Sequence, residues 1–341
     1  MFSIISKAKN QKSNVNESYD EIAPFRPGAT DVEAAREVRT SRGDISYSPA
    51  IFSQLRKLWG IGETEYEDEL SRVTPLGEGA GKSKMLFWKS KRSRYFLKTM
   101  PAGEIATLMG KILKSYFVHM KKHKNSMLPR FLGMYKENGI NFLVQTNVMH
   151  GFKNPYVYDL KGSLRHRKLK DFKRGKVGKD ANFGDSTISS AKNEEIIKAL
   201  ESDSNWLKRS NLMDYSLLVV MDDGTGKACS SSLLPAVASF RGSFKGPPPS
   251  GSKKVCVHVG VIDILQKFGI KKMAERYFKT KRQNKIEDSE VSAIQSSPYK
   301  VRFMAMAKDI FDRPGKRKWK SPRKKKSPRK RKSPRKRKSR V

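Results

Sequence analysis

Residues 76–84, LGEGAGKSK, combine three glycines with lysine and serine, a composition that suits the binding of nucleotide phosphates. The stretch lacks the spacing of a Walker A loop, which needs four residues between its outer glycine and Gly-Lys-Ser. Only three residues separate Gly77 from Gly81, and the residues that follow are strand-like rather than helical. Because a P-loop leads directly into the helix whose N-terminus holds the phosphates, this stretch is not a P-loop.

The residues after the glycine run indicate a second way to hold a nucleotide. Residues 85–100, MLFWKSKRSRYFLKTM, read as two short strands turned around Lys89–Arg94, and Lys98 lies in the second. In protein kinases a glycine-rich hairpin covers the phosphates, and a lysine on a neighbouring strand pairs with them. In those kinases a helix follows the strand that carries the lysine, and Pro101 predicts the start of an amphipathic helix at the same place in this chain. A glycine run alone would equally suit an ordinary turn, but its coupling to Lys98 and the helix favours a kinase-type lid.

Phosphoryl transfer also needs one carboxylate beside the nucleophile and another on magnesium. The protein-kinase motifs His-Arg-Asp and Asp-Phe-Gly are absent from the sequence. Two aspartates nevertheless lie at the edges of apolar, strand-like runs: Asp214 in LMDYSLLVV and Asp263 in VGVIDIL. A carboxylate in such a place is costly to bury without a partner, and a metal ion or a substrate hydroxyl would supply one. Either aspartate alone would also fit a helix N-cap or a solvated strand end.

The elements that must position these groups can be followed along the chain. Its 341 residues suffice for one large domain or two ordinary ones, and 37% hydrophobic with 31% charged residues indicates a globular body with polar extensions. Residues 1–43 predict a flexible segment with one helix at Asp31–Arg39. Residues 169–190 read mostly as loop, and 191–209 as a helix. Residues 223–252 are rich in Gly, Ser and Pro and predict an insertion before a buried strand.

The charge of the chain points to phosphate-bearing partners. The net charge is +39, and residues 316–340 contribute 17 Lys or Arg with no acid. Nucleic acid, anionic lipid and nucleotides are all candidates on this ground. No apolar run approaches the roughly 20 residues that span a bilayer, so we expect a soluble protein that can sit on a membrane surface. With only Cys229 and Cys256, we expect no disulfides.

Three sequence motifs, found in this order, make the kinase interpretation more specific: YDLKGS (158–163), LMDYSLLV (212–219) and VIDILQ (261–266). With SPAIFSQLRKLWGI, LPRFLGMY and SSPYKVRF, they resemble the phosphatidylinositol phosphate kinases over roughly residues 44–312. The resemblance implies a two-lobed α+β fold, distantly like that of protein kinases, with antiparallel sheets, packed helices and a flat basic membrane face. The implied domain spans 44–314, divided into an N-lobe of about 44–160, a C-lobe of about 161–314 and an activation segment of about 264–296.

The same resemblance implies roles for individual residues. ATP and Mg²⁺ would be the nucleotide and metal, with Asp263 holding the metal and Asp214 orienting or deprotonating the inositol hydroxyl. Lys98 and Lys161 would contact the ATP phosphates. The phosphate-covering loop would consist of Gly79, Gly81, Lys82 and Ser83. Glu104 is the natural acidic partner of Lys98, although it stands one place from the family's usual acid.

Substrate choice in the family follows the activation segment. Glu275 falls where enzymes that use the 4-phosphate lipid carry Glu and those that use the 5-phosphate lipid carry Ala. The other implied substrate contacts are basic: Lys271, Lys272, Lys279, Arg167 and Arg302. The stretch around Glu275 would also suit an ordinary solvated amphipathic helix.

These features together predict an ATP-dependent phosphatidylinositol 4-phosphate 5-kinase that makes phosphatidylinositol 4,5-bisphosphate. Three alternatives remain: a kinase of the same family with another monophosphate preference, a catalytically silent lipid-binding module, and a basic-tailed nucleic-acid-binding protein without turnover. Protein-kinase activity is disfavoured by the basic activation segment and by the absence of the His-Arg-Asp and Asp-Phe-Gly motifs.

The KSPRK repeats of residues 320–340 have no apolar residue to bury, and residues 315–341 are predicted to form a disordered tail. The tail would suit an anionic-membrane tether, a DNA-binding arm with nuclear import, or a solvated charge run. We expect phosphatidylinositol 4-phosphate in anionic membranes as the main partner, with nucleic acid and a homodimer left open. The expected location is the cytoplasm, peripheral at the cytosolic face of membranes, with the nucleus open through the tail.

Overall fold

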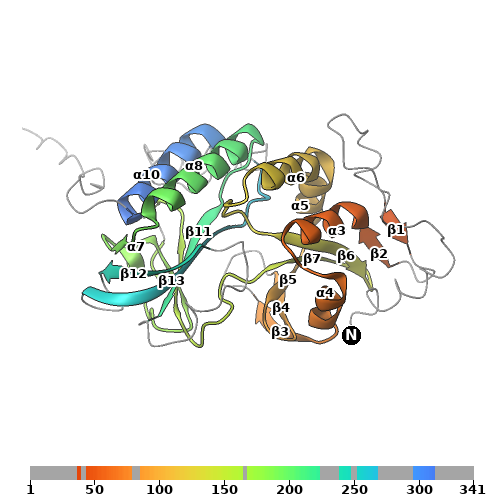
Figure 1. The fold of residues 1–341 in the computed structure, drawn as a ribbon, viewed down its shortest axis with the longest axis horizontal. Coiled ribbons are helices and arrows are strands. Elements are labelled where there is room, and N and C mark those ends of the chain that lie inside the picture. The colour runs from red at the N-terminus through yellow and green to blue at the C-terminus, as the bar shows by residue number, and fades with distance from the viewer. Residues whose placement is uncertain are drawn as a thin grey trace, which may run out of the picture.

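The computed structural model describes residues 37–39, 44–78, 85–163, 167–222, 238–246, 252–267 and 295–311. These residues form an α+β fold with one sheet in each of two lobes, which confirms the predicted fold class (Figure 1). Several predicted site residues lie outside the described ranges: Gly79, Gly81, Lys82, Ser83, Lys271, Lys272, Glu275 and Lys279. The basic tail and most of the activation segment lie outside them too, so what the sequence predicts for these segments stays a prediction.

The N-lobe sheet has seven strands in the order β1-β2-β6-β7-β5-β4-β3. Every neighbouring pair is antiparallel. The strands are β1 (Glu37–Arg39), β2 (Ile45–Tyr47), β3 (Val73–Glu78), β4 (Leu86–Ser90), β5 (Tyr95–Thr99), β6 (Phe131–Glu137) and β7 (Ile140–Thr146). Lys98 lies on β5, between β4 and β7 in the sheet, and is therefore fixed by backbone pairing on both sides.

The N-lobe helices are α3 (Pro49–Leu58), α4 (Glu63–Leu70), α5 (Ala102–Thr107), the π-helix η2 (Leu108–Ile112) and α6 (Leu113–Lys122). The sequence predicts one continuous amphipathic helix from Pro101, but the structure interrupts it at η2, where Gly110 has non-helical backbone angles. The apolar face survives the interruption, because Leu108, Ile112 and Leu113 are all buried. The kink therefore separates α5, which carries Glu104, from the longer α6 without opening the core.

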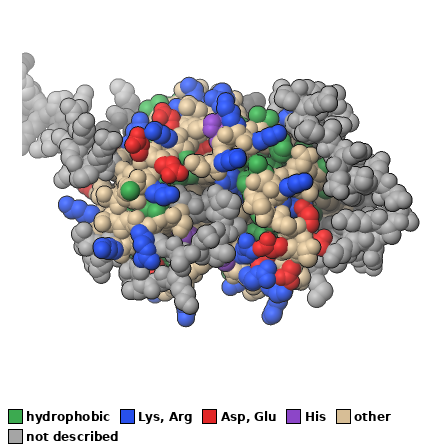
Figure 2. Space-filling view, in the orientation of Figure 1, with side chains coloured by type: hydrophobic (Ala, Val, Ile, Leu, Met, Phe, Trp, Pro, Cys, Tyr) green, Lys and Arg blue, Asp and Glu red, His purple; other side chains and the backbone are tan. Residues whose placement is uncertain are grey.

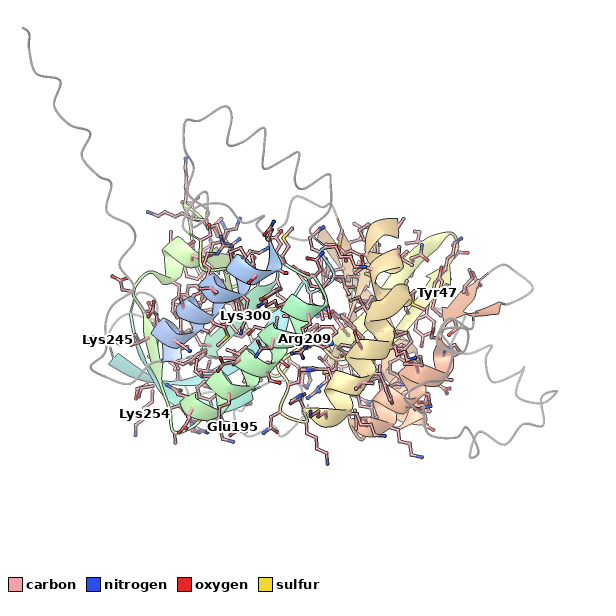
Figure 3. The ribbon with its side chains drawn as sticks, turned by 90° about the horizontal axis from the view of Figure 1, so that it is seen from above. Tyr47, Glu195, Arg209, Lys245, Lys254 and Lys300 are labelled. Carbon is pink, nitrogen blue, oxygen red and sulfur yellow. The ribbon has the colours of Figure 1, made fainter. Side chains whose placement is uncertain are left out.

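The C-lobe sheet has six strands in the order β10-β12-β13-β11-β8-β9. Only β8 and β9 pair in parallel. The strands are β8 (Tyr156–Leu160), β9 (Val177–Lys179), β10 (Thr187–Ser189), β11 (Ser216–Asp222), β12 (Ala238–Lys245) and β13 (Ser252–Ile262), and the helices are α7 (Asp180–Phe183), α8 (Asn193–Arg209) and α10 (Ser296–Phe311). Seen from above, α8 and α10 lie side by side across this sheet, where Lys300 of α10 donates to Asn205 of α8 at 2.6 Å (Figure 3).

Two sequence predictions are corrected by the structure. Glu37–Arg39, the end of the helix predicted at Asp31–Arg39, instead form β1, which pairs with β2. Residues 223–252 are not one uninterrupted insertion, because Ala238–Lys245 form β12 and pair with the whole first part of β13. Phe240 and Phe244 on β12 are buried, so this strand belongs to the core of the lobe.

The two lobes share one hydrophobic core and are also joined by a buried carboxylate. The core cluster includes Leu97 and Val144 from the N-lobe sheet and Val219 from the C-lobe sheet. Asp203 of α8 is fully buried and accepts hydrogen bonds from the N-lobe side: the Met127 backbone amide at 2.7 Å, the Ser126 hydroxyl at 2.8 Å and His119 Nε2 at 2.7 Å. Within the described ranges, every helix is too short or too polar to traverse a bilayer.

Candidate active site between the two sheets

The register of the C-lobe sheet gathers three of the predicted residues at one edge. Leu160 of β8 pairs with Leu217 of β11, and Ile262 of β13 pairs with Ser216 of β11. The chain therefore leaves β8 at Lys161, enters β11 just after Asp214 and leaves β13 at Asp263, all at the same end of three adjacent strands. Antiparallel pairing places these groups together although about a hundred residues separate the first from the last.

Lys161 and Asp214 form a close ion pair at this edge. Lys161 Nζ lies 2.8 Å from Asp214 Oδ1 and 2.5 Å from the Asp214 backbone oxygen. The Lys161 side chain is only 13% exposed and that of Asp214 22% exposed. The ammonium group thus holds the carboxylate in one orientation. The prediction that Lys161 contacts ATP phosphates stays a prediction, since in this structure its partner is Asp214.

Lys98 joins the N-lobe sheet to the same edge. Its side chain is 3% exposed, and Nζ lies 3.3 Å from Asp263 Oδ1 and 3.8 Å from Glu104 Oε2. Burial by itself would lower the pKa of Lys98, but the carboxylates of Asp263 and Glu104 raise it above its ordinary value. Burial raises the pKa of Glu104, and Lys98 opposes that shift. Glu104 is therefore an acidic partner of Lys98, despite its displaced position in the sequence.

Both aspartates have an unusual backbone. Asp214 has φ of 64° and Asp263 has φ of 58°, in the left-handed region that non-glycine residues seldom adopt. Asp tolerates this region better than most residues, but a left-handed non-glycine residue still costs on the order of 1 kcal/mol or more. Such strain often accompanies functional positions. Here it turns the Asp214 and Asp263 side chains at the strand ends where the two ion pairs form.

Asp263 is the residue best suited to hold magnesium. Its side chain is 49% exposed, so its carboxylate remains open to solvent beside Lys98. In the part of the chain that the structure describes, no cluster of three or more His, Cys, Asp or Glu could hold a metal ion. Magnesium in kinase sites does not need one, because it binds through one or two carboxylates together with substrate phosphates. The oxygen donor and its exposure fit the metal.

Arg167 and Arg302 are both linked to the loop that follows β8. Arg167 Nη2 is 3.0 Å from Asp159 Oδ1, and Arg167 Nε also donates to Asp180. A Cβ added at Gly162 in this loop would come within 3.1 Å of Arg302 Cγ, so α10 packs directly against it. Arg167 is thus linked through Asp180, and Arg302 through Gly162, to the loop that carries Lys161. Their predicted contact with lipid phosphate stays a prediction.

Asp180 is the residue of this region that sequence reasoning missed. It begins α7, is 8% exposed and accepts the backbone amides of Lys161, Gly162 and Ser163 at 3.0, 2.7 and 3.3 Å. The sequence signal was weak, because the short elements β9 and α7 are hidden in residues 169–190, which read as loop. A carboxylate that binds a loop 17 to 19 residues earlier leaves no local pattern.

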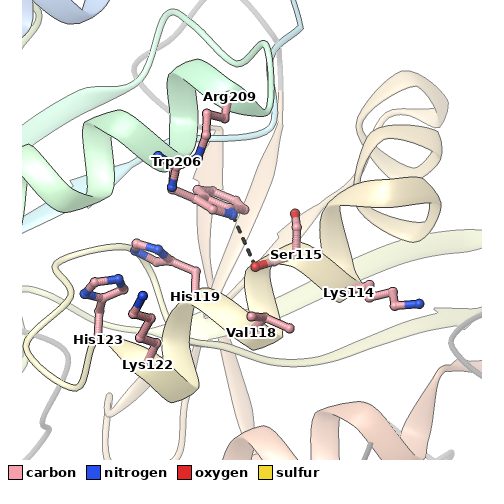
Figure 4. Close-up of a pocket in the computed structure, with 8 residues that line it drawn as sticks. All are labelled: Lys114, Ser115, Val118, His119, Lys122, His123, Trp206 and Arg209. Carbon is pink, nitrogen blue, oxygen red and sulfur yellow. Dashed lines mark hydrogen bonds between the residues drawn. The ribbon is translucent and has the colours of Figure 1, made fainter. Parts of the chain in front are cut away.

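A separate cavity of about 600 Å³ lies between α6 and α8, lined by Lys114, Ser115, Val118, His119, Lys122, His123, Trp206 and Arg209 (Figure 4). Two of its basic residues have a structural explanation, since Lys122 stands in the last turn of α6 and Arg209 in the last turn of α8. Cations there compensate the negative ends of the helix dipoles. None of the predicted site residues lines this cavity.

The described surface carries both signs of charge (Figure 2). On α4, Glu65, Asp68 and Glu69 form ion pairs with Lys91, Arg92 and Arg94 of the β4–β5 turn. The predicted flat basic membrane face depends largely on residues outside the described ranges and stays a prediction.

Cys256 is buried on β13 and is not a free thiol, and Cys229 lies outside the described ranges, so the expected absence of disulfides is not confirmed.

Comparison with known proteins matches these features to one family. The family model for phosphatidylinositol-4-phosphate 5-kinase matches residues 72–236 and 235–310, well over half of the chain. These ranges contain the Lys98–Asp263, Lys161–Asp214 and Arg167–Asp180 ion pairs.

Individual relatives carry two different names. The chain is 28% identical over 307 residues to a phosphatidylinositol 4-phosphate 5-kinase of Plasmodium falciparum, covering 76% of this chain and 18% of that protein. It is 27% identical over 318 residues to phosphatidylinositol 4-phosphate 5-kinase 3 of Arabidopsis thaliana, covering 78% of this chain and 44% of that protein. It is also 27% identical over 322 residues to phosphatidylinositol 5-phosphate 4-kinase type-2 gamma of Danio rerio, covering 78% and 76%. The chain thus spans less than half of the first two relatives.

Proposed function

Because the chain belongs to the phosphatidylinositol phosphate kinase family, we propose that it phosphorylates the 5-hydroxyl of phosphatidylinositol 4-phosphate with ATP. The product is phosphatidylinositol 4,5-bisphosphate, made at the surface of anionic membranes. The matching family model and the relatives named 4-phosphate 5-kinases support this choice of substrate. The resemblance at Glu275 supports it as well. Relatives named 5-phosphate 4-kinases make the opposite monophosphate preference the second candidate.

One observation carries the proposal: two ion pairs, Lys98–Asp263 and Lys161–Asp214, lie at one edge where the two sheets meet. Each pair combines a cation suited to phosphate with a carboxylate suited to a metal or a hydroxyl. In-line phosphoryl transfer relies mainly on positioning and charge stabilisation, which this set of groups can supply. A lipid-binding module without turnover has no need of two strained aspartates paired with buried lysines.

In the proposed mechanism, each group acts on a defined partner. Lys98, fixed by its strand and by Glu104, binds the ATP phosphates, and Asp263 would hold the magnesium ion. Magnesium bound with ATP would neutralise charge on the phosphates. Asp214, held by Lys161, accepts the proton of the inositol hydroxyl as the hydroxyl oxygen bonds to the γ-phosphorus and the bond to ADP breaks.

We predict that purified protein transfers labelled phosphate from ATP to vesicles containing phosphatidylinositol 4-phosphate. Lys98→Met should lower kcat/KM by on the order of a hundredfold or more, because the variant removes the one cation of β5 that faces Asp263. The assay compares vesicles of each of the three phosphatidylinositol monophosphates and identifies the product by its headgroup. The variant Lys89→Met, on the neighbouring strand β4, serves as the control and should retain activity.

The lipid that is phosphorylated decides between the two candidate functions. A product from the 4-phosphate lipid supports the proposal, and one formed mainly from the 5-phosphate lipid selects the second candidate within the family. If no monophosphate is phosphorylated, or if Lys98→Met matches the wild type, the kinase assignment is wrong.

A further inference from the structure

Asp180 lies at the point where the Lys161 loop and Arg167 meet, and it is nearly buried. One carboxylate oxygen accepts three consecutive backbone amides, and the other accepts Arg167 Nε. We infer that Asp180 is a positioning residue. It holds the 161–163 loop and the Arg167 guanidinium in fixed relative positions, and so aligns the Lys161–Asp214 pair with the phosphate of the lipid headgroup. This inference rests on the proposed function for the identity of the headgroup.

The loop 161–163 has the form of an anion-binding nest. Successive backbone amides that point to one centre commonly bind a phosphate or a similar anion. Here the chain fills that centre with its own carboxylate, Oδ1 of Asp180. Gly162 permits the shape, because its φ is +70° and any side chain would meet the backbone of α10 at Arg302. The backbone of Lys161 is therefore held in place before any substrate arrives. The Lys161 side chain extends from this fixed backbone, and its Nζ contacts Asp214.

Arg167 is held from two sides by the same arrangement. Its Nε donates to Asp180 Oδ2, and its Nη2 lies 3.0 Å from Asp159 Oδ1. Burial would lower the pKa of Arg167, but the carboxylates of Asp159 and Asp180 raise it above its ordinary value. Its backbone oxygen also accepts the amide of Ala181, the next residue of α7. The guanidinium plane is thus fixed, and within the described ranges Nη1 makes no hydrogen bond and can meet a phosphate.

The variant Asp180→Asn separates these two functions. The remaining amide oxygen can still accept the backbone amides of the 161–163 loop. The new NH₂ group then faces Arg167 Nε, another donor, so the arginine loses both a charge partner and its alignment. We expect KM for phosphatidylinositol 4-phosphate vesicles to rise roughly tenfold to a hundredfold, while KM for ATP changes by less than about threefold.

The test combines kinetics with a double-mutant cycle. Asp180→Asn, Arg167→Gln and the double variant are assayed for both KM values. If Asp180 acts through Arg167, adding Asp180→Asn to Arg167→Gln should raise the lipid KM by less than about twofold. The matched control is Asp203→Asn, which alters a carboxylate of similar burial that also binds a backbone amide, but lies between α6 and α8. It should lower stability without changing the ratio of the two KM values.

A second readout keeps the inference separate from the proposed function. Hydrogen exchange at Arg167 Nε, followed by nitrogen-15 NMR of arginine side chains, should be slow in the wild type and at least tenfold faster in Asp180→Asn. If the wild type shows no kinase activity while this exchange difference appears, the proposed function fails and the positioning of Arg167 by Asp180 stands. Equal exchange rates, additive effects on lipid KM, or equal increases in both KM values would overturn the inference.

Discussion

The variant Asp214→Asn is expected to bind both substrates and to transfer phosphate a hundredfold to ten-thousandfold more slowly than the wild type. An amide has nearly the same shape as the carboxylate and can still accept a hydrogen bond from Lys161 Nζ, but it cannot take a proton from the inositol hydroxyl. Removing a positioned general base typically lowers kcat by this amount. Steady-state kinetics with phosphatidylinositol 4-phosphate vesicles measures the loss, which should appear in kcat with little change in KM for ATP.

The control for this variant is Asp222→Asn, at the far end of the strand β11 that follows Asp214. Asp222 pairs with Arg174 at 2.7 Å and lies away from the catalytic edge, so kcat should stay within about threefold of the wild type. A kcat for Asp214→Asn within tenfold of the wild type would mean that another group accepts the proton. A large rise in KM for ATP without loss of kcat would assign Asp214 to nucleotide binding instead.

The largest effect on stability is expected from Asp203→Ala. The Asp203 carboxylate is fully buried and accepts hydrogen bonds from the Met127 amide, the Ser126 hydroxyl and His119. Truncation leaves these donors without their partner inside the junction of the lobes. Removing one partner from a buried charged network typically costs about 3–5 kcal/mol of unfolding free energy. Urea denaturation followed by circular dichroism measures the change.

Glu194→Ala on the same helix is the matched control. Its side chain is 65% exposed and pairs with Lys198 one turn later, a contact that contributes about 0.5 kcal/mol at most. A loss of less than about 1 kcal/mol for Asp203→Ala would show that the lobes do not depend on this carboxylate. A change in the slope of the urea transition would show that the two lobes unfold separately in the variant.

Much of the proposed catalytic site was predictable, because its residues lie within apolar strands or at their ends. Asp214 and Asp263 stand beside runs of Val, Leu and Ile that are buried in β11 and β13, and a carboxylate in that setting needs a partner. Lys98 was recognisable for the same reason. The sequence could not give the pairing, because whether Lys161 meets Asp214 or a phosphate depends on strand register and side-chain reach. The structure supplies both.

The features that sequence reasoning missed depend on distant contacts. Strand β12 contains Gly and Ser and reads as part of a linker, yet pairing with β13 buries Phe240 and Phe244, four residues apart on one face. At β1, Glu37–Arg39 fit a helical pattern locally, but pairing with β2 makes them a strand. Asp180 has no local signal at all, since its partners lie in the loop after β8. In each case tertiary pairing overrides a weak local preference.

The central claim is that Lys98 and Asp263, from different sheets, act in one magnesium–nucleotide site. The affinity for ATP, measured by calorimetry with and without Mg²⁺ in the wild type and in Asp263→Asn, tests this claim most directly. Mg²⁺ should tighten ATP binding to the wild type by at least tenfold, and this gain should disappear in Asp263→Asn, whose affinity for ATP alone remains measurable through Lys98. The same gain from Mg²⁺ in both proteins, or no ATP binding by the wild type, would contradict the claim.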